Sequence, residues 1–111
     1  MTMQTMLNPV IAAYIEDSNA ANTEAQIAHF KNDAVVLDEG GTHRGTEEIR
    51  GWAEKTHAEY HFKLEPLDVA EENGESVVTC QVSGTFPGSP IQLHFRLKLD
   101  GDKIASLRII D

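Results

Sequence analysis

The second half of the chain alternates between apolar and polar residues, and this pattern constrains the fold more than any other feature. The alternation starts at Tyr60 and is interrupted by Asn73-Gly74, by Pro87–Pro90 and by Asp100-Gly101. A period of two places alternate side chains on one face of a strand, and Asn-Gly and Asp-Gly are strong hairpin signals. The pattern predicts four consecutive antiparallel strands, the last of which covers residues 103–110.

The first half of the chain predicts helices and one further strand. Asn8-Pro9 is typical of a helix N-cap followed by proline, and Thr23 with Gln26 has the spacing of a capping box. A β-branched run at 34–37 predicts a strand, and Thr46 is expected to cap a third helix. Helices followed by antiparallel strands indicate an α+β fold, in which the helices close a strongly curved sheet around an apolar pocket.

Length and composition narrow the class of protein. The 111 residues correspond to one domain, 1–111, and the net charge of -9 argues against nucleic acid as a partner. No apolar run approaches the roughly 20 residues of a membrane span. Cys80 is the only cysteine, so no internal disulfide can form, and a cytoplasmic location is expected.

Two polar residues are candidates for chemistry. Alternation places Asp38 on the same strand face as Ala34 and Val36, so its carboxylate is expected either at the rim of the buried face or desolvated. Desolvation would raise its pKa and make it a stronger base. Tyr14 belongs to an apolar helical stripe, so its ring is expected to be buried and its hydroxyl to need a partner. Together they can move a proton next to a carbonyl group. Alternatively, Asp38 is a strand-end turn residue and Tyr14 an ordinary core tyrosine.

Four further residues are expected to line the same pocket, because they share the inward parity or stripe. The predicted lining residues are Val36, Trp52, Phe86 and Leu93. Trp52 and Phe86 can equally be core residues. A metal site is not expected, because His57 and His61 straddle the end of a helix and no third ligand stands near them.

Two segments, Phe30–Asp38 and His43–Arg50, together with the order of elements, resemble the nuclear transport factor 2-like superfamily. Within it the chain is most similar to ketosteroid isomerases and SnoaL-like polyketide cyclases. The resemblance implies that Tyr14 donates a hydrogen bond, that Asp38 is the catalytic base, and that no cofactor takes part. It also implies a homodimer paired through the outer face of the sheet.

The segment Pro90–Leu97 departs from the isomerases at one position. They carry an acid immediately before a His-Phe-Arg sequence, where this chain has Leu93. Leucine cannot donate a hydrogen bond, so a true ketosteroid isomerase is not expected. The sequence favours a cofactor-free isomerase or cyclase that acts on a small apolar carbonyl compound. The alternative is a non-catalytic module of the same fold that binds an apolar ligand or dimerises.

Overall fold

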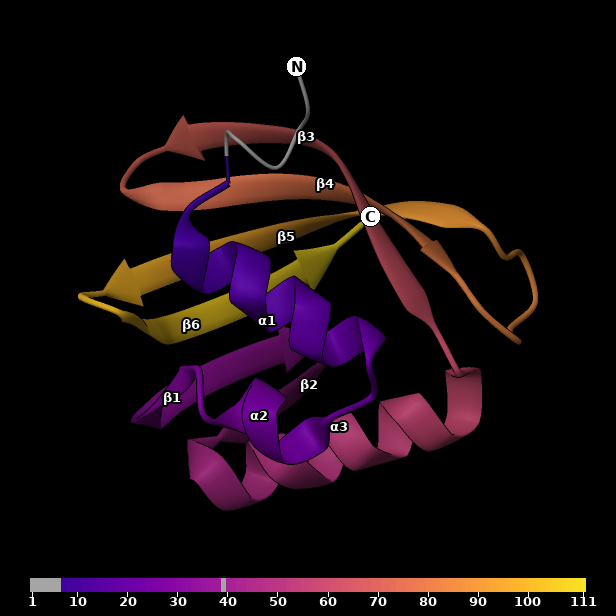
Figure 1. Cartoon of the computed structure of the whole chain (residues 1–111), viewed down its shortest axis with the longest axis horizontal. Helices are drawn as coiled ribbons and strands as arrows, with labels where there is room; N and C mark the ends of the chain where they lie inside the picture. Colours follow the sequence, from indigo (N-terminus) through magenta and orange to yellow (C-terminus); the bar gives the residue numbers. More distant parts are fainter. Residues whose placement is uncertain (1–6, 39) are drawn as a thin grey trace.

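The computed structural model describes residues 7–38 and 40–111, and they form an α+β domain (Figure 1). The helices are α1 (Pro9–Asn19), α2 (Thr23–Ile27) and α3 (Gly45–Tyr60). The strands are β1 (Phe30–Asp38), β2 (Gly41–Arg44), β3 (Lys63–Glu72), β4 (Glu75–Ser83), β5 (Ile91–Asp100) and β6 (Lys103–Ile110). The predicted fold class is confirmed. In the described part of the chain, no helix is long and apolar enough to cross a membrane.

All six strands belong to one sheet in the order β2-β1-β6-β5-β4-β3. Every neighbouring pair is antiparallel except β1 with β6, which is parallel. The sheet is therefore mixed and mostly antiparallel, as predicted. Register shifts interrupt β1, β3 and β5, and such irregularities bend a strand and increase its twist. They contribute to the curvature that Figure 1 shows.

The hairpin turns follow the sequence signals. Asn73 and Gly74 both have positive φ angles, of 53° and 80°, which is the requirement of a type I′ turn. They connect β3 to β4 with Glu72 opposite Glu75. Gly101 also has a positive φ, of 65°, and the turn that contains it joins β5 to β6. The predicted last strand has the observed bounds.

The helix starts differ in detail from the expected caps. Asn8 caps α1 as predicted, since its side chain accepts a hydrogen bond from the Val10 backbone N–H at 2.8 Å. The cap of α2 is Asn22 instead of Thr23, because the Asn22 carboxamide oxygen accepts from the Ala25 N–H. A carboxamide one position earlier thus satisfies an N–H group in the first turn of this helix.

The third helix begins at Gly45, not after a cap at Thr46. The short strand β2, which pairs with β1, directly precedes this helix. Gly45 has a φ of +81°, a conformation that a residue with a side chain rarely adopts, so β2 can turn directly into α3. The Glu48 carboxylate then accepts the Arg44 backbone N–H at 2.8 Å.

The helices cover the concave side of the sheet. α3 packs against β1 and β2, and α1 packs against β3. The short helix α2 lies between α1 and α3 (Figure 1). On the inward face of β4, Val78, Cys80 and Val82 are buried as their alternation predicts. On β5, Phe95 and Leu97 are buried, whereas Leu93 and Leu99 are half-buried and Ile91 is exposed. Tyr60 and Phe86 lie outside the strands, since Tyr60 ends α3 and Phe86 belongs to the loop between β4 and β5.

Two glycine substitutions should have opposite effects on stability. A Cβ at Gly84 would overlap the carbonyl oxygen of Tyr60 and lie 3.1 Å from the Phe62 Cα, so Gly84→Ala should destabilise by about 1–3 kcal/mol. A Cβ at Gly51, in α3, would meet no atom within 4 Å, so Gly51→Ala should stabilise by roughly 0.5–1 kcal/mol. Urea unfolding measures both. A Gly84→Ala protein as stable as the wild type would contradict the close packing of this loop on α3.

Candidate functional site

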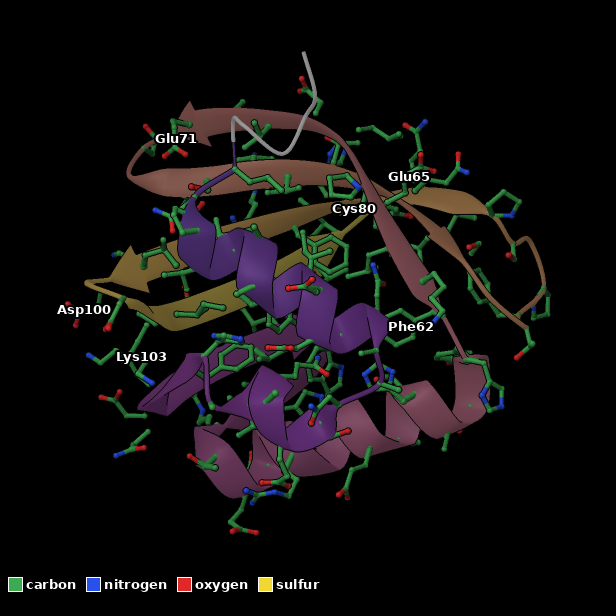
Figure 2. The ribbon with its side chains drawn as sticks, viewed as in Figure 1. Phe62, Glu65, Glu71, Cys80, Asp100 and Lys103 are labelled. Carbon is green, nitrogen blue, oxygen red and sulfur yellow. The ribbon has the colours of Figure 1, made fainter. Side chains whose placement is uncertain are left out.

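A cavity of about 360 Å³ lies between α1, α3 and the concave face of the sheet. Six of the seven aromatic residues of the chain line it. They are Tyr14, Trp52, Tyr60, Phe62, Phe86 and Phe95. Phe62 follows α3 at the point where the chain turns into β3 (Figure 2). Among the described residues, Asp38 is the only one in the lining with a formal charge at neutral pH, so the described wall is apolar except at a few defined atoms.

Five of the six residues predicted for the site line this cavity, and one does not. Tyr14 and Asp38 meet there, and Trp52, Phe86 and Leu93 belong to the same wall. Val36 is a correction, because it is completely buried in the core and is absent from the lining. Its position in the middle of β1, paired with both β2 and β6, explains the difference, since only the end of this strand reaches the cavity.

Asp38 lies at the end of a strand and also lines the cavity. It is the last residue of β1 and forms the final pair of the β1–β2 hairpin with Gly41. Its half-buried carboxylate also accepts a hydrogen bond from the Trp52 indole Nε1–H at 3.0 Å. Among the described residues, no cation forms an ion pair with Asp38. The carboxylate is therefore oriented by a neutral donor and remains available to a ligand.

Tyr14 is almost completely buried, with 2% of its surface exposed. Its ring meets Phe30 edge to face at 5.5 Å, and its hydroxyl oxygen accepts a hydrogen bond from Gln26 Nε2 at 3.2 Å. Burial raises the pKa of Tyr14 well above its ordinary value, the bond from Gln26 opposes this, and the charge of Asp38 adds to it. Tyr14 is therefore a neutral hydrogen-bond donor at physiological pH.

The sequence did not reveal the support behind Tyr14. Gln26 is 1% exposed, and its amide oxygen accepts from His57 Nε2 at 2.9 Å. The His57 ring stacks on the cavity residue Phe62 with centroids 4.7 Å apart and planes inclined by 6°. No local pattern in the sequence marks Gln26 as a buried residue. The capping-box interpretation placed it at the start of a helix.

Leu93 and His94 lie on opposite faces of β5. Leu93 lines the cavity, whereas His94 Nδ1 lies 2.9 Å from Thr79 Oγ1 on the outer face, as the alternation predicts. The position that carries an acid in the isomerases is therefore an apolar part of the wall. Across the described residues, no group of three or more His, Cys, Asp or Glu side chains is placed to hold a metal ion.

Comparison with known proteins agrees with this fold. The model of the SnoaL-like domain family matches residues 11–107, so the chain belongs to this family. No curated protein matches the chain. The crystal structure of a presumptive polyketide cyclase from Sinorhizobium meliloti is similar, with a TM-score of 0.93 and 30% identity over 97% of this chain and 99% of that one.

Two more distant structures share the fold alone. A hypothetical protein from Catenulispora acidiphila with a ketosteroid isomerase-like fold, in complex with trimethylamine, has a TM-score of 0.80 and 20% identity over 93% of this chain and 85% of that one. An uncharacterised cystatin-fold protein from Novosphingobium aromaticivorans has a TM-score of 0.76 and 20% identity over 92% and 95%. The expected superfamily is confirmed.

The buried phenol of Tyr14 should make stability fall at high pH. The folded state holds its proton above the ordinary pKa of 10.0, so the unfolded state loses a proton first as pH rises. From about pH 10 upward, the free energy of unfolding of the wild type should fall by on the order of 1 kcal/mol per pH unit more than that of Tyr14→Phe. Burial also raises the pKa of Cys80 to about 12, but this contribution is common to both proteins. Urea unfolding between about pH 9 and 11 measures the difference. Parallel pH profiles would show that Tyr14 is not buried as described.

Proposed function

We propose that this cavity is the active site of a cofactor-independent isomerase or cyclase that acts on a small apolar carbonyl compound. Asp38 is the general base and Tyr14 is the hydrogen-bond donor to the carbonyl oxygen. The observation that carries the proposal is that an oriented carboxylate without a cationic partner and a neutral, buried phenol line one apolar cavity. A base and an oxyanion donor on the same substrate are the two groups that proton transfer next to a carbonyl requires.

The proposed reaction needs no group beyond these two. The Asp38 carboxylate removes a proton from the carbon next to the carbonyl, and the electron pair moves toward the carbonyl oxygen. The Tyr14 hydroxyl stabilises the developing negative charge. Asp38 then returns its proton to another carbon of the enolate. The Trp52 N–H keeps the carboxylate in place, and the aromatic wall excludes water, which strengthens both interactions.

The size of the cavity limits the substrate. An apolar cavity of about 150 Å³ accommodates one benzene ring, so about 360 Å³ corresponds to roughly two fused rings. Leu93 limits the chemistry, because it leaves the enolate with one donor where the isomerases have two. Removal of one such donor typically costs about 3–4 kcal/mol of transition-state stabilisation. Both features support a substrate other than the four-ring steroid of a true ketosteroid isomerase.

A non-catalytic ligand-binding module is the second candidate. The Catenulispora acidiphila protein has the same fold and was crystallised with trimethylamine. The cavity of this chain combines aromatic rings with one carboxylate, which is a suitable environment for an organic cation. In this function Asp38 is a counter-ion, and no proton transfer to carbon occurs.

Hydrogen–deuterium exchange distinguishes the two candidates without knowledge of the natural substrate. The two-ring ketone 2-tetralone has exchangeable protons next to its carbonyl, so the wild type should accelerate their exchange in D₂O, as followed by NMR. Asp38→Asn should abolish the acceleration because an amide cannot accept the proton. Asp33→Asn, at an exposed carboxylate of the same strand, is the matched control. Binding of 2-tetralone without exchange in the wild type would favour the ligand-binding module.

An acid introduced at position 93 should increase the rate of proton exchange. Leucine and aspartic acid are similar in volume, and the apolar wall can hold the acid protonated, so that it donates a second hydrogen bond. Leu93→Asp should therefore accelerate exchange at least about tenfold. Asp38→Asn in the same background should remove the gain. An unchanged rate in a folded Leu93→Asp protein would mean that the carbonyl oxygen does not lie beside Leu93.

We also propose that the outer face of the sheet pairs two chains. The exposed apolar residues Leu37 and Ile110 lie on this face. Arg96 and Arg108 lie on it as well, and both pair with the Glu75 carboxylate. A stable dimer needs about 800 Å² per partner. Sedimentation at micromolar concentration should give twice the 12.3 kDa mass of the chain. Ile110→Lys should shift the protein to the monomer, whereas Leu67→Lys, at an exposed residue of the edge strand β3, should not. A monomeric wild type would rule this pairing out.

A further inference from the structure

Three side chains from three helices form a continuous chain of hydrogen bonds that ends at the cavity. His57 of α3 bonds to Gln26 of α2 over 2.9 Å, and Gln26 bonds to Tyr14 of α1 over 3.2 Å. Of the three, only Tyr14 lines the cavity. Burial of a glutamine amide without partners would cost several kcal/mol by order of magnitude, so both ends of Gln26 must be satisfied. The structure satisfies both ends.

The hydrogen bonds all run in one direction. Gln26 uses its amide oxygen to accept from His57, so its N–H group is left to donate to the Tyr14 oxygen. Burial, and secondarily the charge of Lys63, lower the pKa of His57, so the ring is neutral and carries one proton at neutral pH. That proton must be on Nε2 if His57 is the donor. The Tyr14 oxygen is thus an acceptor within the protein, and its own proton remains unused there.

From this arrangement we infer that Gln26 and His57 are positioning residues that direct the Tyr14 proton into the cavity and strengthen it as a donor. The inference rests on the proposed function, in which that proton meets the carbonyl oxygen of the substrate. A hydroxyl that already accepts a hydrogen bond is polarised and donates a stronger one. The hydrogen-bonded series His57, Gln26 and Tyr14 is called the relay below. The relay strengthens Tyr14 as the single donor in a cavity where Leu93 provides none.

The reverse direction would have the opposite consequence. If the Gln26 amide were turned around, its oxygen would face Tyr14, and the phenol would donate its proton to the protein instead of the ligand. The Phe62 stack holds the imidazole ring beside Gln26, so the direction of the Gln26 amide is coupled to the tautomer of His57. The tautomer of His57 therefore determines whether the Tyr14 hydroxyl donates its proton to the protein or into the cavity.

A ligand-free experiment tests the direction of the relay. Nitrogen-15 NMR at neutral pH should show His57 as the neutral tautomer with its proton on Nε2. Gln26→Met, which is close in shape but has no amide, should release this preference and give a mixture of tautomers. A wild-type His57 with its proton on Nδ1 would overturn the inference, whether or not any ketone binds.

A second experiment tests the effect on the donor. The infrared carbonyl band of bound 2-tetralone should be shifted to lower frequency by Tyr14, and Tyr14→Phe should remove the shift. Gln26→Met should reduce it by roughly 10–30%. Gln26→Glu places a carboxylate beside the phenol and accepts its hydrogen bond, so the phenol no longer donates to the ketone and the shift should be removed as completely as in Tyr14→Phe. His57→Phe removes the N–H donor to Gln26 and should lose part of the shift. His57→Gln retains an N–H donor and should keep most of it. Gln92→Glu, at an exposed residue of β5, is the matched control.

The two experiments separate this inference from the proposed function. The infrared shift is measured on bound ketone without turnover, so a wild type that shifts the band but exchanges no protons would contradict only the proposed catalysis. An unchanged shift in Gln26→Glu, with the fold intact by thermal unfolding, would overturn only the relay.

Discussion

The parallel pairing of β1 with β6 is the contact on which the site depends. It joins the first strand of the chain to the last one and places Asp38 directly opposite Ile109, a residue of the cavity wall. Without this pairing β1 and β2 would form a separate hairpin, and the carboxylate would be exposed to water. Because parallel pairing brings together residues that are about 70 positions apart, it is also the contact with a high loop-closure cost. The buried residues Val36 and Leu107, paired in register, offset that cost.

The Asp38 carboxylate and the Tyr14 hydroxyl are each held by a hydrogen-bond partner. Trp52, itself part of the cavity wall, orients the Asp38 carboxylate, and Gln26, which lies outside the wall, bonds to the Tyr14 hydroxyl. Both partners lie on the helices α2 and α3, whereas β3, β4, β5 and β6 supply much of the apolar wall. Such a division lets the wall vary to suit different ligands while the carboxylate and the phenol stay fixed. The Catenulispora acidiphila structure shares this fold at 20% identity.

The chemistry of the site follows from what is absent from its lining as much as from what is present. Asp38 is the only charged residue among the described residues that line the cavity, so no cation among them neutralises the carboxylate. In the proposed reaction the enolate is then stabilised by the Tyr14 proton alone, which makes the strength of that donor decisive. The same charge pattern would attract an organic cation, which is why exchange and binding must be measured separately.

Local patterns in the sequence determined the elements and the identity of the main site residues. Alternation assigned the inward faces of β4 and β5, Asn73-Gly74 defined a hairpin, and Tyr14 and Asp38 were expected in one pocket. Period and turn chemistry act over a few residues, so they can be read without a structure. Tertiary packing decided the rest: Val36 is core, and Gln26 is a buried link between Tyr14 and His57. Hydrogen bonds between helices depend on the distances at which those helices pack, and no local pattern contains that information.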